Sequence, residues 1–264
     1  MFDSHTHTKY SVDSKMEAED SINKASELGL EGIAITDHVD IDYPGNEVFN
    51  FDIEEYSNYI DGLIKKYSDK IKILKGIEIG IQPQVTDENI ELAGKIDFDF
   101  IIGSVHVIDK MDPYTGEFYI GKTKEEAYIR YLQAIYEGAL TFKNYDVIGH
   151  IGYIRRYGDI QDRSMDYKDY SDLLDKILRL VIQDGKGIEV NTSGLRGILK
   201  TTIPDESILT RYRKLGGEII TIGSDAHTPK DIGANFSEAC ELLKKIGYKY
   251  TCHFINRKPV FDKL

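Results

Sequence analysis

Residues 1–14 read MFDSHTHTKYSVDS, and this stretch holds two histidines, His5 and His7, and an acidic residue, Asp13. An apolar start with histidines at alternate positions predicts a short strand that ends in ligand-type side chains. Residues i and i+2 of an extended segment point the same way, so His5 and His7 can bind one cation. Two interpretations stay open at this point. The pair is either solvated, with Asp13 as a helix cap, or it supplies the first ligands of a metal site.

The chain alternates short apolar runs with amphipathic stretches, without repeats, low-complexity segments or Pro-rich linkers. After MFDSH, strands are predicted at 32–36, 71–79, 98–105, 146–150, 187–191 and 218–223. Helices are predicted at 15–28, 54–67, 87–94, 125–142, 167–183, 205–215 and 235–246. Strands that alternate with helices imply a parallel sheet, and seven of them in this length favour a closed (β/α) barrel over an open sheet. We expect one α/β domain over residues 1–264.

The 264 residues carry a formal net charge of −12, from 33 Lys and Arg against 45 Asp and Glu. This charge argues against long nucleic acids and anionic membranes as partners. Cys240 and Cys252 are the only cysteines, which fits a reducing compartment rather than a disulfide framework. No segment approaches the ~18–20 apolar residues of a membrane span, and neither a signal peptide nor a GxGxxG motif is found. We therefore expect a cytoplasmic enzyme.

Ligand-type side chains collect where the predicted strands end. Six of the seven histidines lie there with one glutamate and one aspartate, and the full set is His5, His7, His38, Glu78, His106, His150, Asp225 and His227. A parallel barrel builds its active site at the carboxyl ends of its strands. The joint pattern therefore predicts metal binding. His253 belongs to no such motif and is expected to be structural or on the surface.

With Asp13 the set has nine members, whereas a catalytic zinc site needs about three protein ligands. Nine are too many for one ion, generous for two and about right for three. Imidazole and carboxylate without cysteine suit Zn, Mn or Fe and do not decide among them. Glu78, among the histidines of the middle strands, is the natural bridging ligand. Neighbouring side chains in TDH point apart, so we expect His38 to bind the ion and Asp37 to orient the His38 ring.

Taken together, the motifs resemble the polymerase-and-histidinol-phosphatase (PHP) superfamily. They occur in the order DSHTHT, AITDH, GIEIG, GSVH, GHIG and GSDAH and extend from residue 3 to residue 227. Asp13 and the segments HIGYIRRYGD and EVNTSGLR are similar to the histidinol-phosphate phosphatase branch. The resemblance implies a distorted (β/α)7 barrel with three divalent transition-metal ions at the carboxyl ends of its strands.

The resemblance also implies how the nine residues divide among the ions. One ion would be held by His5, His7, Glu78 and Asp225, a second by Glu78, His106 and His150, and a third by Asp13, His38 and His227. Position 13 holds Asp where some members of the superfamily carry His, and both residue types are ligands.

The implied activity is hydrolysis of a small phosphomonoester, L-histidinol phosphate of histidine biosynthesis. Our hypothesis is that a hydroxide bridging two ions attacks phosphorus directly, because bound divalent ions lower the pKa of water to about 7. Glu78, Asp225 and His227 are the expected catalytic residues. Nothing in the sequence names the acid that protonates the leaving group.

Arginines are expected to contact the phosphate, because a guanidinium matches phosphate oxygens bidentately. The candidates are Arg196 and one of the adjacent pair Arg155 and Arg156, between which the sequence does not decide. The long loops 39–53 and 107–123 carry acidic and aromatic residues. Such residues suit the amine and imidazole of L-histidinol phosphate, and they equally suit plain solvated loops.

Three other functions compete with this prediction. A PHP-type phosphoesterase for nucleotides or another small phosphomonoester fits the acidic charge, which disfavours only long nucleic acids. Metal-dependent amidohydrolases also begin with HxH and end with Asp after a late strand, but Glu78 and His106 in the middle strands disfavour amide hydrolysis. A non-catalytic PHP domain that assists a polymerase is disfavoured because the ligand set is complete. The sequence leaves the oligomeric state open.

Overall fold

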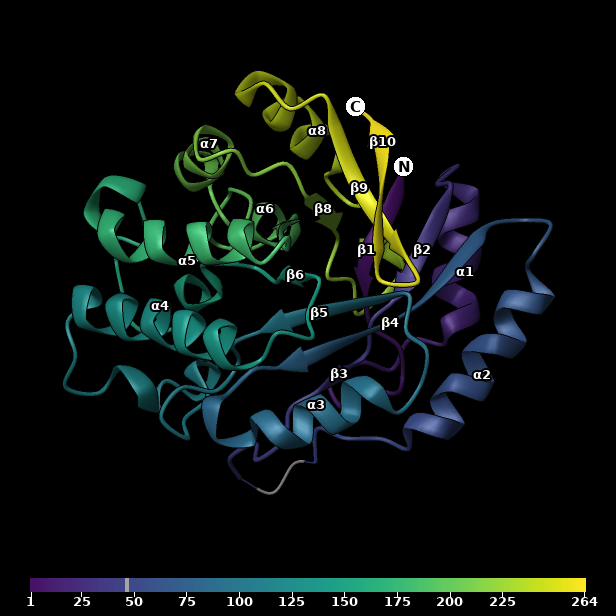
Figure 1. Cartoon of the computed structure of the whole chain (residues 1–264), viewed down its shortest axis with the longest axis horizontal. Helices are drawn as coiled ribbons and strands as arrows, with labels where there is room; N and C mark the ends of the chain where they lie inside the picture. Colours follow the sequence, from purple (N-terminus) through teal and green to yellow (C-terminus); the bar gives the residue numbers. More distant parts are fainter. Residues whose placement is uncertain (46–47) are drawn as a thin grey trace.

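The computed structural model describes residues 1–45 and 48–264. Its parallel strands pair in the order β1-β2-β4-β5-β6-β7-β8 and curve into a nearly closed barrel (Figure 1). Their bounds are β1 Phe2–Thr6, β2 Gly32–Ile35, β4 Lys72–Gly80, β5 Phe100–Ser104, β6 Val147–Ile148, β7 Gly187–Asn191 and β8 Ile220–Gly223. The predicted α/β barrel is therefore confirmed, with a short extra strand, β3 His38–Val39, that pairs with β4.

The first and last strands of this order approach each other at the end where the ligand residues lie. The amide of Asp225 donates to the carbonyl of His5 at 2.8 Å, and the amide of His7 donates to the carbonyl of Ala226 at 2.9 Å. Thr6 and Ala226 form a parallel bridge between these bonds. The segments that carry four of the expected metal ligands therefore also close the barrel.

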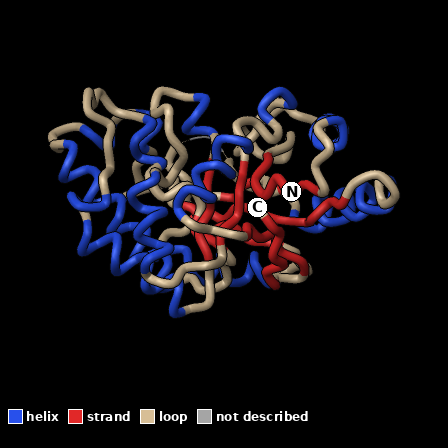
Figure 2. Tube along the Cα trace, turned by 90° about the horizontal axis from the view of Figure 1, so that it is seen from above, coloured by secondary structure: helices blue, strands red, loops and turns tan. Residues whose placement is uncertain are grey.

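Helices cover the outside of the strands, which Figure 2 shows gathered at the centre of the molecule. Their bounds are α1 Ala18–Glu27, α2 Ile53–Lys66, α3 Thr86–Gly94, α4 Lys124–Thr141, α5 Ser171–Gln183, α6 Ser193–Arg196, α7 Glu206–Lys214 and α8 Phe236–Ile246. Local signals fix their starts: Thr123 and Glu126 form a capping box on α4, and Asp52 caps α2. No helix in the described part of the chain is long and apolar enough to span a membrane.

A C-terminal hairpin that the strand predictions did not include covers the amino ends of the barrel strands. It consists of β9 Tyr250–Ile255 and β10 Lys258–Lys263. From β9, Cys252 and Phe254 pack against the inward-facing residues of the barrel, which are Phe2, Ala34, Leu74, Phe100, Ile102 and Val147. The His253 ring stacks on Phe2, with centroids 3.7 Å apart, and its Nδ1 atom contacts Asp262 Oδ2 at 2.6 Å. His253 is structural, as expected.

Candidate metal centre

The first group of ligand residues meets at the seam between β1 and β8. The Nε2 atoms of His5 and His7 lie 2.9 Å apart, so the i, i+2 spacing does bring both rings to one point. The Nε2 atom of His5 lies 3.2 Å from Glu78 Oε2. The Nε2 atom of His7 lies 3.4 Å from Asp225 Oδ1. The four residues surround a position that one cation could take.

A second group lies at the ends of β4, β5 and β6. The Nε2 atom of His150 lies 2.9 Å from Glu78 Oε1, and that of His106 lies 3.4 Å from the same oxygen. Glu78 thus points one oxygen to this group and the other to the first group. The hydroxyl of Ser104 donates to Oε1 and holds the carboxylate in place. Glu78 thus lies between the two groups, where a bridging ligand is expected.

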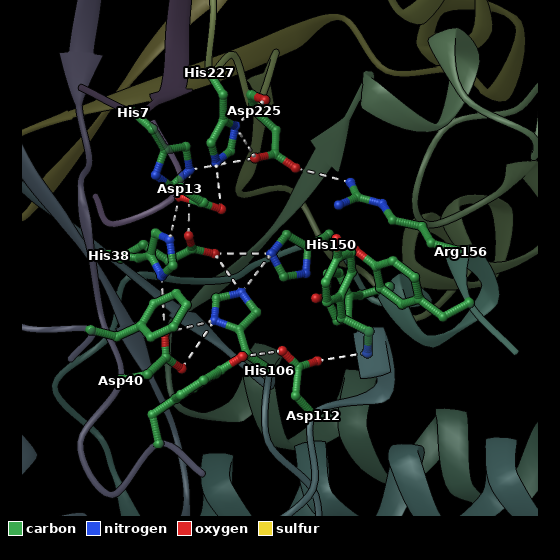
Figure 3. Close-up of a pocket in the computed structure, with 16 residues that line it drawn as sticks. His7, Asp13, His38, Asp40, His106, Asp112, His150, Arg156, Asp225 and His227 are labelled. Atoms are coloured by element: carbon green, nitrogen blue, oxygen red, sulfur yellow. Dashed lines mark hydrogen bonds and ion pairs between the residues drawn. The ribbon is translucent and has the colours of Figure 1, made fainter. Parts of the chain in front are cut away.

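A third group forms around Asp13. Its Oδ1 atom lies 3.0 Å from His38 Nε2, and its Oδ2 atom lies 3.2 Å from His227 Nε2 (Figure 3). Asp13 is not a helix cap, because α1 begins at Ala18 with Glu17 at the cap position. The His227 ring also stacks on the His7 ring, with centroids 4.1 Å apart. The third group is therefore contiguous with the first.

Two buried carboxylates that the sequence analysis did not single out as orienting groups hold the imidazole rings from outside. Glu189 Oε1 lies 2.6 Å from His5 Nδ1. Asp40 lies between two rings, with Oδ2 3.0 Å from His38 Nδ1 and Oδ1 3.1 Å from His106 Nδ1. A carboxylate on Nδ1 fixes the ring and directs Nε2 toward the metal.

Asp37 does not orient His38, so that prediction is wrong. Its carboxylate accepts bonds from the backbone and hydroxyls of Thr8 and Ser11. The hydroxyl of Ser11 donates to Asp37 at 2.7 Å and lies 3.0 Å from His7 Nδ1. Asp37 therefore acts on His7 through Ser11. The side chains of adjacent residues point apart, as expected for TDH, and this alternation places Asp37 against a different loop.

Burial and charge shift the pKa values within the cluster. Burial lowers the pKa of His7 to about 3, and the neighbouring imidazoles add to this effect. Burial also disfavours the charged form of His38, but Asp13 and Asp40 outweigh it and raise its pKa to about 10. Burial acts to raise the pKa of Glu78, yet the surrounding histidines hold it well below its usual range. The lowered pKa of Glu78 keeps this carboxylate ionised beside the imidazole rings.

This donor set fits divalent transition-metal ions. The Nδ1 atoms of His5 and His7 are engaged by Glu189 and Ser11, so in the neutral rings each Nε2 atom keeps a lone pair. These two lone pairs face each other beside Glu78, an arrangement that a cation balances. Triplets of ligand atoms within 4.8 Å of one another include His5, His7 and Asp225; Glu78, His106 and His150; and His7, His38 and His227.

All the candidate ligand residues except His5 line a cavity of about 330 Å³, and the three candidate arginines differ in their relation to it. Arg156 lines the cavity, and its Nη2 atom donates to Asp225 Oδ2 at 2.9 Å. Arg155 points elsewhere, with its Nε atom bonded to the carbonyl of Arg163 at 2.7 Å. Arg196 donates to the carbonyl of Ser224 at 2.7 Å and does not line the cavity. The sequence did not decide between Arg155 and Arg156. In the structure only Arg156 of this pair lines the cavity.

The fold and the site define the class of this protein. A family model described as PHP domain matches residues 3–193, and the chain belongs to this family. It is 36% identical over 257 residues to the histidinol-phosphatase of Lactococcus lactis subsp. lactis, which covers 97% of this chain and 95% of that protein. It is 34% identical over 263 residues to the probable histidinol-phosphatase of Clostridium acetobutylicum, covering 99% and 96%.

A solved structure resembles this one along nearly the whole chain. It is the histidinol phosphate phosphatase from Lactococcus lactis subsp. lactis, complexed with zinc, L-histidinol and phosphate. The TM-score is 0.92 at 34% sequence identity, and the match covers 99% of this chain and 98% of that chain. The nine candidate ligand residues therefore lie in a fold that is shared with a zinc-bound protein.

Proposed function

We propose that this protein is a metal-dependent phosphatase that hydrolyses L-histidinol phosphate in the cytoplasm. One observation carries the proposal: the chain matches, over 99% of its length, a structure that holds zinc, L-histidinol and phosphate. The convergence of all nine predicted ligand residues on one region supports it. The proposed substrate is a small molecule, and no long nucleic acid or membrane is involved.

We assign three divalent ions to the three groups of residues around His5, His106 and Asp13. When bound, such ions lower the pKa of water and neutralise phosphoryl oxygens. Glu78 shares its two oxygens between the first and second groups, so it fixes the spacing between them. Zn, Mn and Fe all suit these ligands.

The chain itself supplies a phosphate-binding cation. The bonds that hold Arg156 run from its Nη2 atom to Asn191, Ser193 and Asp225. The other guanidinium N–H groups make no hydrogen bond to another described residue, so we assign them to the phosphate oxygens. The guanidinium also lies over the Tyr153 ring, 5.2 Å from its centroid, which limits its movement.

The proposed catalytic residues are Glu78, Asp225 and His227. Glu78 and Asp225 border the first ion position, and Asp225 also fixes Arg156. The Nδ1 atom of His227 lies 3.1 Å from the carbonyl of Asp225, which directs its Nε2 atom toward Asp13 and the cavity. Asp225 adopts a left-handed backbone conformation, with φ 55°, so its side chain leaves the strand direction and turns into the site.

The substrate assignment is tested by measuring phosphate release with Zn or Mn supplied. We expect kcat/KM for L-histidinol phosphate to exceed that for sugar phosphates, nucleotides and phosphotyrosine by about 100-fold or more, because a site with polar partners for a substrate rejects analogues that lack them. Equal values across the panel would refute the substrate while leaving the fold intact. His150→Ala and Glu78→Ala should both lose turnover with metal restored, and wild-type turnover in either would refute the site.

A further inference from the structure

The His150 ring differs from the other histidine rings of the cluster in how it is held. Each of the others has a partner within 3.1 Å of its Nδ1 atom, which is a carboxylate for three rings, a hydroxyl for His7 and a backbone carbonyl for His227. The Nδ1 atom of His150 is buried and makes no hydrogen bond to any of the described residues. The orientation of this ring therefore depends on the backbone that carries it.

The backbone of His150 is held at both of its polar groups. Its amide donates to Glu189 Oε2 at 2.8 Å. Its carbonyl accepts the hydroxyl of Tyr131 at 3.2 Å, at the point where the chain turns with a φ of 21°. A positive φ is uncommon for a residue other than glycine, so the turn needs contacts that hold it in this conformation.

The Tyr131 hydroxyl bonds to three backbone groups of this turn. Besides donating to His150, it accepts the amides of Gly152 at 3.2 Å and Tyr153 at 3.3 Å. One donated and two accepted bonds use the full hydrogen-bonding capacity of a hydroxyl. Tyr131 lies on α4, which carries none of the nine candidate ligands, and its side chain is fully buried in the hydrophobic core. The turn is therefore anchored to a rigid element outside the cluster.

The same turn leads to Arg156. Tyr153 begins a short 3-10 helix, Tyr153–Arg156, so the bond to its amide fixes where this helix starts. Figure 3 shows His150 and Arg156 on the same side of the ligand cluster. A shift of the turn would thus move one candidate metal ligand and the proposed phosphate-binding cation together.

We infer that Tyr131 is a positioning residue for the metal centre. It acts through the backbone of the turn and takes the place of the Nδ1 partner that the other histidine rings have. The inference rests on the proposed function, because it takes His150 as a ligand of the second ion. It adds a residue outside the cavity whose hydroxyl holds a ligand in its binding geometry before the ion arrives.

The test compares Tyr131→Phe with Tyr128→Phe. Both residues lie on α4 and are fully buried, and both changes remove the same oxygen atom and keep the ring. The Tyr128 hydroxyl makes no hydrogen bond within the described part of the chain, so Tyr128→Phe is the matched control. Wild type and both variants are loaded with Zn²⁺ and dialysed against a series of chelator concentrations. Elemental analysis then measures the zinc that each protein retains.

We expect Tyr131→Phe to bind one ion per chain at least about 10-fold more weakly than wild type, because loss of a group that orients a ligand typically costs 10–100-fold in metal affinity. Tyr128→Phe should retain zinc as wild type does. In proteins loaded with Co²⁺, only Tyr131→Phe should change the visible absorption spectrum, which depends on the ligands and geometry of the bound ion. A general loss of stability does not change this spectrum in the folded protein.

Zinc retention and a Co²⁺ spectrum equal to those of wild type would overturn the inference, as would an equal loss in both variants. If Tyr131→Phe does not fold, amide hydrogen exchange of metal-free wild type decides. Protected amides at Gly152 and Tyr153 would support the inference, and rapid exchange there would overturn it. A wild-type protein that binds no metal would refute the proposed function instead. Amide exchange of Tyr131→Phe against wild type would then still test whether Tyr131 holds the turn.

Discussion

At the scale of single residues, Asp40 contacts ligand rings from two different groups. Its carboxylate touches Nδ1 of His38 in the third group and Nδ1 of His106 in the second. Gly80 makes room for it, because a Cβ atom at that position would overlap the Asp40 carboxylate. The final glycine of GIEIG is thus explained by the close approach of a neighbouring side chain. Asp40 orients both rings with one buried charge.

We predict that Asp40→Asn lowers the metal content of the purified protein by at least one ion per chain. An amide is neutral and has one acceptor oxygen where the carboxylate has two, so the His38 and His106 rings lose the negative charge and one of the oxygens that hold them. Loss of such an orienting residue typically costs 10–100-fold in metal affinity or activity. Elemental analysis and kcat/KM measure the two effects, with Asp42→Asn as the control. Full metal content together with unchanged kcat/KM would contradict the orienting role.

At the scale of elements, the hairpin β9–β10 explains how the amino end of the barrel is sealed. Arg257 in its turn contacts Asp146 Oδ2 at 2.6 Å, and the Asn256 amide donates to Asp99 Oδ1 at 2.9 Å. Both turn residues have positive φ, 48° for Asn256 and 65° for Arg257, as in a two-residue hairpin turn. Asn-Gly is the usual signal for this turn. The Arg in second place weakened that signal in the sequence.

We predict that Phe254→Ala destabilises the protein by about 3–5 kcal/mol, the usual cost of removing a buried phenylalanine. Phe254 is 4% exposed and packs inside the barrel. The matched control is Phe261→Ala on the neighbouring strand, where the residue is 49% exposed. That change should cost no more than about 1 kcal/mol. Urea unfolding measures both values, and equal costs would refute the sealing role of β9.

The candidate ligand residues other than Asp13 could be predicted from the sequence because each lies at the end of a recognisable apolar strand or directly after it. The residues that orient them could not. Glu189 lies within the strand GIEVN, where nothing distinguishes an inward-facing acid from a solvated one, and Asp40 lies in a polar loop. Alternation along TDH was recognised, but which neighbours Asp37 meets depends on how the loop around Ser11 folds back. Contacts between segments far apart in sequence leave no local pattern.

Element boundaries differed for a related reason. β6 covers only Val147–Ile148, because the chain turns at His150, where φ is 21°. The helix predicted from residue 167 begins at Ser171, after a separate turn at Tyr167–Asp169. After β6 the burial continues through Gly149 and His150, so the hydrophobic pattern extends beyond the regular strand. Before α5, Tyr167–Asp169 contains no buried residue, and the buried Tyr170 lies next to the start of the helix.

At the scale of the whole molecule, the proposed ions hold together segments from all around the barrel. We predict that removing them with a chelator lowers Tm by about 5–10 °C, as expected for ligands present at about 100 times their Kd. Added Zn or Mn should restore Tm. In His150→Ala the chelator should cause a smaller decrease. A Tm that does not respond to the chelator would refute the metal centre independently of any activity.

The seam between β1 and β8 has a consequence for synthesis of the chain. Ser224 donates its amide to the Asp3 carboxylate, a partner 221 residues earlier. At ribosomal rates, on the order of tens of seconds pass between the emergence of these two residues. During that interval His5 and His7 lack Asp225, and the first ion position is incomplete. For the proposed ion at this position, we therefore expect loading to follow translation of nearly the whole barrel, because its proposed ligand Asp225 is translated late.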